Sequence, residues 1–277
     1  MKTEIELITP DKAKEYLSTS VGNRAIRSRD VEKFIRDLRS GNFLLTHQGI
    51  AFDTDGHLRD GHHRLTAIAL SGVSADMMVT SGMPKEAFSV IDNGSKRTFE
   101  DALVFEEDSK FDDYPYYRNK ASVAMIRKIV SIGYNSALIL SNAEIKKLLM
   151  AFGEQVEIIY HASVTKKAEP AAVRAASLSA LLCGESREDI ESFFEIFSSG
   201  NITGAEGKNI SAAFNWKKQI MEAKVKKTAF SNAKLYSGTQ NAIWSFINLE
   251  NTKLIRATSK STRYPVDKLI EAILKTK

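Results

Sequence analysis

Cysteine is almost absent from this chain, which has one, Cys183, among its 277 residues. A single cysteine excludes a framework of internal disulfides and is typical of a reducing compartment, so we expect a cytoplasmic protein. Long apolar runs are also missing, which excludes a membrane-spanning helix, and we expect no membrane partner. Residues 1–12 lack the apolar core of a signal peptide, so we expect no export.

Extremes of composition are missing too. Hydrophobic residues make up 43% of the chain and charged residues 26%, which excludes a disordered chain and allows one large domain or two ordinary ones. The net charge of +5 is unevenly spread, because residues 205–277 hold 14 Lys and Arg against 5 Asp and Glu. This excess predicts a surface that faces a polyanion, and a solvated lysine-rich surface is the alternative.

Strand and helix patterns alternate in the first hundred residues. Residues 4–8 and 75–82 have the composition of strands, and residues 28–40 carry apolar side chains at helical spacing behind an expected cap, Ser28. Asp55-Gly56 is a dipeptide typical of a tight hairpin turn.

An acidic stretch broken by Pro115 follows, and beyond it the sequence is almost wholly helix-like. We therefore predict an α+β protein, with an α/β domain over residues 1–105 and an all-α domain over residues 106–277 whose C-terminal part is basic.

In the segment HLRDGHHRLTAIALSG, residues 57–72, a group of ionisable side chains directly precedes an apolar run. Gly61 lies where a strand pattern gives way to a helix, so the backbone can turn tightly there and approach a ligand. The first N–H groups of a helix lack partners and the helix dipole is positive there, which predicts an anion site. Arg64 and His63 add donors for phosphate oxygens, and Asp60 can hold Mg²⁺ or orient an imidazole.

Other interpretations of this segment stay open. Four of the five histidines fall within 17 residues, namely His47, His57, His62 and His63. They are candidates for a zinc site, although no His-x-x-x-His or Cys-x-x-Cys spacing is present, or for ordinary surface residues. A serine hydrolase is disfavoured because the chain has no Gly-x-Ser-x-Gly.

The longer stretch GNFLLTHQGIAFDTDGHLRDGHHRLTAIALSGV resembles the core of the ParB/sulfiredoxin superfamily. The resemblance implies that Gly61 and Arg64 face the phosphates of a bound nucleotide. It also implies that Asn23, Arg24 and Arg27, in GNRAIRSRDVEKFIRDLRSGN, contribute to the nucleotide pocket.

This chain differs from two members of the superfamily, the ParB proteins and the sulfiredoxins, at positions of the motif. ParB proteins read Gly-Glu-Arg-Arg, whereas His62 and His63 stand here at the second and third of these positions. Sulfiredoxins need a cysteine where this chain has His62. The Asp-Gly-x-His-Arg form is similar to that of free-serine kinases and DGQHR-type proteins, which implies that Asp60, His63 and Arg64 handle a phosphoryl group and its metal. The candidate catalytic residues are therefore Asp60, His62 and His63, and the candidate metal ligand is Asp60.

The chain also resembles phage and prophage proteins with a ParB-like nuclease domain, which share an element like VIDNGSKRTFEDAL. In that element Arg97 and Thr98 stand at a second helix start, which predicts a second phosphate contact. The alternative is an ordinary turn followed by a helix cap.

The basic C-terminal part interleaves lysines with aromatic residues. Lysines contact the phosphate backbone of nucleic acid without reading its sequence, so this part predicts DNA binding, while the aromatic side chains at helical spacing are more typical of a core. The predicted nucleic-acid contacts are Lys217, Lys218, Lys224, Lys226, Lys227 and Lys234.

Together these patterns favour a phage- or prophage-type kinase or NTPase that binds ATP or another nucleoside triphosphate with Mg²⁺ and acts in DNA-related phosphoryl chemistry. The alternatives are a DNA-binding accessory protein that uses the nucleotide as a switch, or a metal-dependent nuclease. A homo-oligomer is compatible with the sequence.

Overall fold

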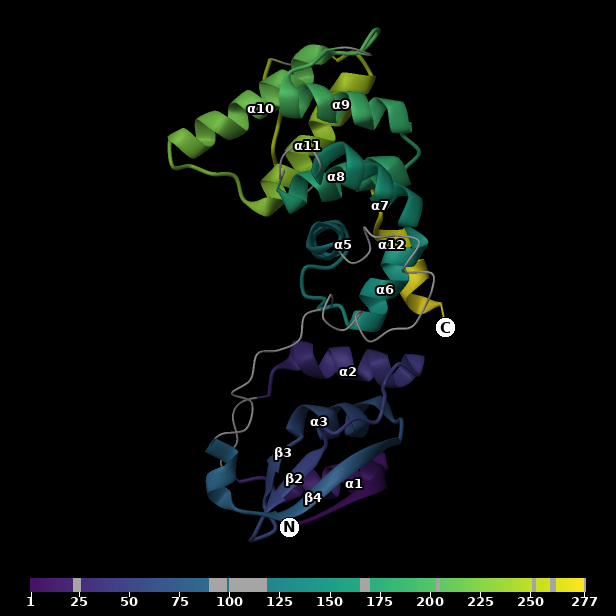
Figure 1. Ribbon diagram of the computed structural model, residues 1–277, viewed down its shortest axis with the longest axis vertical. Coiled ribbons are helices and arrows are strands. Elements are labelled where there is room, and N and C mark those ends of the chain that lie inside the picture. Colours follow the sequence, from purple (N-terminus) through teal and green to yellow (C-terminus); the bar gives the residue numbers. More distant parts are fainter. Residues whose placement is uncertain are drawn as a thin grey trace. The chain divides into compact units, whose positions relative to one another are not determined.

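The chain folds into two compact units. A computed structural model describes residues 1–21, 26–89, 99, 119–164, 170–202, 205–250, 253–259 and 263–276. One unit comprises residues 1–96 with 137–143 and 277, and the other residues 97–136 with 144–276 (Figure 1). The predicted boundary at residue 105 lies outside the described residues.

The first unit combines a four-stranded sheet with helices (Figure 1). The strand order is β1-β4-β2-β3, in which β4 pairs antiparallel with β1 and parallel with β2, and β3 pairs antiparallel with β2. The elements are β1 (Lys2–Ile8), α1 (Pro10–Ser18), α2 (Ser28–Ser40), β2 (Ile50–Asp53), β3 (Leu58–Asp60), α3 (His62–Ser71), β4 (Ala75–Met83) and the 3-10 helix η1 (Lys85–Ser89). The mixed α/β content expected of this part is confirmed.

Helix α3 is the central helix of the first unit, because both α1 and α2 pack against it. Leu65 and Ile68 of α3 are fully buried with Ile8 and Val79 of the sheet and Leu38 of α2. Burying a side chain of this size contributes roughly 1.5–3 kcal/mol, so the core holds α3 in place through its central turns.

One helix boundary differs from the prediction. The expected cap of α2, Ser28, is already helical, and Arg27 is the N-cap residue with extended backbone angles of φ −92° and ψ 107°. The carbonyl of Arg27 accepts from the N–H groups of Asp30 and Val31, and no side chain caps this end. The other end agrees with the prediction, since Gly41 ends α2 at φ 76°.

The hairpin predicted at Asp55-Gly56 joins β2 to β3, with Gly56 at φ 83°. A buried carboxylate, Asp53, organises it by accepting from the N–H groups of Asp55 and His57, both at 2.9 Å, and from Arg59 Nε at 2.8 Å. Burial acts to raise the pKa of Asp53, but these donors outweigh it and lower the pKa to about 2.

All the regular elements among the described residues of the second unit are helices. Its elements are α5 (Lys120–Gly133), α6 (Asn142–Ala151), α7 (Gly153–Ile159), the π-helix η4 (Tyr160–Val164), α8 (Ala171–Leu182), α9 (Arg187–Ser199), α10 (Ile210–Val225), α11 (Asn232–Ile247) and α12 (Asp267–Lys275). Helix α8 is buried from Ala172 to Leu181. Trp216 of α10 is fully buried and donates from Nε1 to Thr239 Oγ1 at 2.9 Å. None of the described helices is both long enough and apolar enough to cross a membrane.

We predict that Asp53→Asn lowers the free energy of unfolding at pH 7, because Arg59 and two backbone N–H groups lose an anionic acceptor. The folded-state pKa lies below the unfolded value, so the carboxylate contributes stability above about pH 4 that is lost as the pH falls toward 2. Urea denaturation followed between pH 7 and 2 should therefore show a shallower acid decline in the variant than in the wild type.

Asp11→Asn is the control for this measurement, since the Asp11 side chain is 93% exposed and pairs with Lys14 at the surface. We expect it to follow the wild-type curve closely. Equal acid declines in the wild type and Asp53→Asn would contradict the role given to Asp53.

Candidate functional site

The turn from β3 into α3 is fixed by Gly61. This residue is buried and has a left-handed conformation with φ 98°, which a side chain disfavours. An added Cβ would lie 3.1 Å from both Cα and Cγ1 of Ile50 and 3.3 Å from the carbonyl oxygen of Gly49. The backbone at Gly61 therefore packs directly on the start of β2, and this contact sets where α3 begins.

The first turn of α3 presents unpaired backbone donors. The earliest helical hydrogen bond runs from Leu65 N–H to the Gly61 carbonyl at 2.9 Å. The N–H groups of His62, His63 and Arg64 precede it, and they find no acceptor among the described residues. No side chain caps this end, so the arrangement has the donors and the positive helix-dipole end that suit an anion.

His62 reaches back to the chain that follows α1. Its Nε2 lies 2.7 Å from Ser20 Oγ, and the pair is partly buried. Burial lowers the pKa of His62, His63 lowers it further and the carboxylate of Asp60 acts to raise it. The lowered pKa favours the neutral imidazole, and its Nε2 is within hydrogen-bond distance of the hydroxyl of Ser20.

His63 accepts a hydrogen bond at Nε2 from the backbone N–H of Arg27, at 3.1 Å. A neutral imidazole that accepts at Nε2 carries its proton at Nδ1. His63 thus keeps one N–H to offer to a ligand, as the sequence predicts for it. The Arg27 side chain is exposed beside this contact.

The two histidines contact Ser20 and Arg27, which lie on either side of residues 22–25 in the sequence. Asn23 and Arg24 of the predicted nucleotide pocket lie outside the described residues. The chain just before Ser20 also makes a main-chain contact, because Leu58 N–H donates to the Thr19 carbonyl at 3.3 Å. The structure thus brings Arg27 to the histidine turn.

Arg64 and Asp60 lie at the same turn. Arg64 donates from Nη1 to the Gly49 carbonyl at 2.9 Å and from Nη2 to Gln48 Oε1 at 3.3 Å, so part of its guanidinium holds the start of β2. Asp60 Oδ2 lies 3.9 Å from Arg64 Nη1, and the Asp60 side chain is 38% exposed. Three of the five guanidinium N–H groups are not used by these two bonds.

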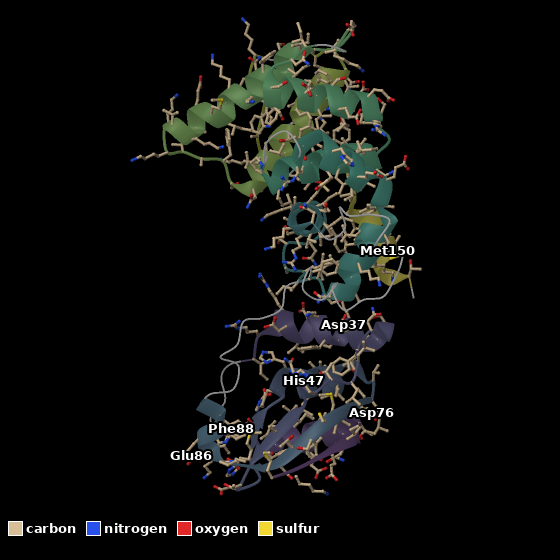
Figure 2. All side chains as sticks on the ribbon, in the orientation of Figure 1. Asp37, His47, Asp76, Glu86, Phe88 and Met150 are labelled. Carbon is tan, nitrogen blue, oxygen red and sulfur yellow. The ribbon has the colours of Figure 1, made fainter. Side chains whose placement is uncertain are left out.

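The predicted histidine cluster is divided between different surroundings. His47 is exposed in the loop before β2 (Figure 2), and His57 lies with Nδ1 3.7 Å from Asp53 Oδ2. Among the described residues, no three His, Cys, Asp or Glu side chains are grouped to hold a metal ion. Arg97 and Thr98, of the predicted second phosphate contact, lie outside the described residues.

The predicted nucleic-acid contacts are in α10, α11 and the connection between them. Lys217 is partly buried, donates to the Ser198 carbonyl at 2.6 Å and lies over the ring of Phe197. Lys218 is exposed and lies 3.9 Å from Glu222. The other predicted contacts are all exposed, namely Lys224, Lys226, Lys227 and Lys234.

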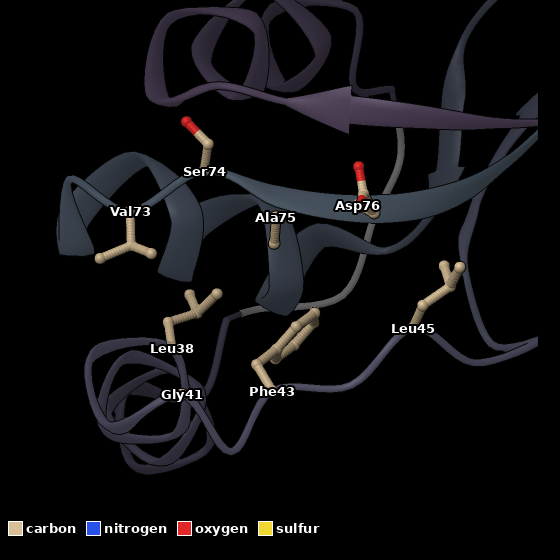
Figure 3. Close-up of a pocket in the computed structure, with 8 residues that line it drawn as sticks. All are labelled: Leu38, Gly41, Phe43, Leu45, Val73, Ser74, Ala75 and Asp76. Atoms are coloured by element: carbon tan, nitrogen blue, oxygen red, sulfur yellow. The ribbon is translucent and has the colours of Figure 1, made fainter. Parts of the chain in front are cut away.

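A cavity of about 300 Å³ lies at the opposite end of α3 from the histidine turn. Figure 3 shows Val73 and Ala75 pointing toward Leu38 and Phe43, while Ser74 and Asp76 point to the other side of β4. Its lining consists of Leu38, Gly41, Phe43, Leu45, Val73, Ser74, Ala75 and Asp76. Because a ten-residue helix is about 15 Å long, this cavity is separate from the predicted phosphate site.

Two residues of the site were not predicted from the sequence. Ser20, the partner of His62, is 42 residues away along the chain, and no local pattern connects them. The sequence does contain a signal for Asp53. It stands at the first position of a turn, where an aspartate commonly accepts hydrogen bonds from the N–H groups that follow it. Its pair with Arg59 extends the site, since Arg59 Nη1 also donates to the Val21 carbonyl at 2.9 Å.

Comparison with known proteins finds no matching family model, curated protein or solved structure.

We predict that Gly61→Ala destabilises the first unit more than Gly72→Ala, which ends the same helix. Both glycines have positive φ, so an alanine at either costs about 1–2 kcal/mol in backbone strain. Only at Gly61 would the new Cβ press on Ile50 and Gly49, which adds about 1–3 kcal/mol. Urea denaturation measures both, and equal losses of stability would contradict the close packing of the turn.

Proposed function

We propose that the first unit binds the phosphate groups of a nucleoside triphosphate at the start of α3 and acts on them in phosphoryl chemistry. The observation that carries this proposal is the first turn of α3, where the N–H groups of His62, His63 and Arg64 lack acceptors among the described residues. The turn at Gly61 packs closely on Ile50 and Gly49, which favours donors that are already positioned to meet an anion.

Further donors surround the turn. His63 keeps its Nδ1–H, Arg27 has an exposed guanidinium and Arg64 keeps three N–H groups beyond its two bonds. Phosphoryl transfer chiefly requires positioning and neutralisation of charge, which a set of fixed donors and cations supplies. These donors suit phosphate oxygens and do not distinguish one base from another. They therefore support ATP or another nucleoside triphosphate as the ligand.

Asp60 is the carboxylate that fits Mg²⁺ at this turn. It is partly exposed and its nearest basic partner, Arg64, is 3.9 Å away, so its oxygens remain accessible. Mg²⁺ usually takes one or two carboxylates together with phosphate oxygens and water, and Asp60 beside bound phosphates meets that requirement. The ion would neutralise charge on the transferred phosphoryl group.

The experiment that tests this function measures the thermal stability and binding heat of the protein with ATP, ADP, CTP and GTP, each with and without Mg²⁺. We expect at least one triphosphate to bind and to stabilise the fold by about 2.7 kcal/mol at a hundredfold excess over Kd. Arg64→Ala should weaken that binding at least tenfold, because it removes donors and cationic charge beside the phosphates.

Arg39→Ala is the matched control, since it removes an exposed arginine from the last turn of α2 and should bind like the wild type. The far-UV spectrum of each variant shows whether it folds. Absence of binding by all four nucleotides, or equal binding by Arg64→Ala and Arg39→Ala, would contradict the proposal.

A second candidate function is that of a DNA-binding accessory protein. The observation that favours it is the group of exposed lysines where α10 ends, Lys224, Lys226 and Lys227, with Lys234 early in α11. Lys217 contributes less to such a surface, because its ammonium is engaged with Ser198 and Phe197. Cations at the C-terminal end of a helix also stabilise that helix, which is the structural alternative.

Under this second function, reversing Lys224, Lys226 and Lys227 to glutamate should weaken binding to duplex DNA. The plot of log K against log salt concentration should become shallower by about 0.9 for each DNA phosphate that the variant no longer neutralises. The control is a second triple variant in which Lys120, Lys268 and Lys275, which are also exposed, are changed to glutamate. It changes the net charge by the same amount. Equal weakening in both triple variants, measured by fluorescence anisotropy, would exclude a specific surface at α10.

A further inference from the structure

Ser20 and His62 form a hydroxyl–imidazole pair that neither the sequence motif nor the proposed phosphate contacts require. The Oγ–Nε2 distance is 2.7 Å, within the range in which an imidazole accepts the proton of a serine hydroxyl. A nucleophile beside its own base is the arrangement that activates serine in group transfer.

The position of Ser20 places this hydroxyl at the predicted phosphate site. His62 is the first residue of α3, so its side chain joins Ser20 to the helix end whose first N–H groups have no acceptor among the described residues. The main chain around Ser20 is fixed by the hydrogen bond from Leu58 N–H to Thr19 and by that from Arg59 Nη1 to Val21. The main chain is thus held on both sides of Ser20, while His62 contacts its hydroxyl.

We propose that Ser20 is a nucleophile that takes the terminal phosphoryl group of the bound nucleoside triphosphate, with His62 as its general base. This inference rests on the proposed function, since it needs the nucleotide phosphates at the start of α3. It adds a covalent phosphoserine at Ser20, formed either as an intermediate or as a modification of the protein itself.

The step balances as an in-line displacement. Ser20 Oγ forms a bond to the γ-phosphorus, and the bond between that phosphorus and the β–γ bridging oxygen breaks with its electron pair on the oxygen. The nucleoside diphosphate leaves, and the hydroxyl proton moves to His62 Nε2 and then to solvent. No redox partner is needed.

The test incubates the full chain with Mg²⁺ and each γ-labelled triphosphate, and maps the product by peptide mass spectrometry. We expect one phosphoryl group on Ser20, found in the tryptic peptide of residues 15–24. Ser20→Ala should abolish it, and Ser18→Ala should keep it, because the Ser18 hydroxyl donates to the Glu15 carbonyl of its own helix. His62→Gln keeps a hydrogen-bonding side chain and should slow labelling by about a hundredfold or more.

Nucleotide binding is measured by calorimetry on the same samples, so that the two proposals can fail separately. Binding without label on Ser20, or label at the same rate in His62→Gln, would overturn this inference and leave the phosphate site standing. Absence of any nucleotide binding would overturn both.

Discussion

The packing of Gly61 on the start of β2 is the constraint on which the rest of the first unit depends. The missing side chain lets the turn approach Ile50 and Gly49, and α3 begins directly after this left-handed residue without a side-chain cap. Arg64 reinforces the same contact by donating to the Gly49 carbonyl. The sheet, the helix start and the candidate anion site are therefore positioned by one close backbone approach.

The two histidines of the turn connect this constraint to a second segment of the chain. His62 contacts Ser20 and His63 contacts Arg27, so two residues that follow α1 in the chain meet side chains from the first turn of α3. One imidazole is thereby next to a hydroxyl, and the other keeps a single N–H for a ligand. This division gives the adjacent histidines different chemistry, one suited to accept a proton and the other to donate a hydrogen bond.

Much of the fold is predictable from local patterns. Asp55-Gly56 indicates the hairpin and Gly72 the end of α3, because positive φ is what glycine tolerates at such positions. Ser28 shows where local patterns fail, since the chain leaves extended geometry one residue earlier, where Arg27 also meets His63. Such a contact depends on residues far apart in the sequence, and the Ser20–His62 pair could not be predicted for the same reason.

The central claim is that the first turn of α3 binds phosphate through its backbone, and the most direct measurement is the amide ¹H–¹⁵N spectrum of the protein during titration with pyrophosphate and Mg²⁺. A bound anion shifts the resonances of the N–H groups that donate to it. We predict saturable shifts that are largest at the amides of His62, His63 and Arg64 and weaker toward the C-terminal end of α3. Unchanged amides at these three residues, or shifts confined to the lysines where α10 ends, would contradict the claim.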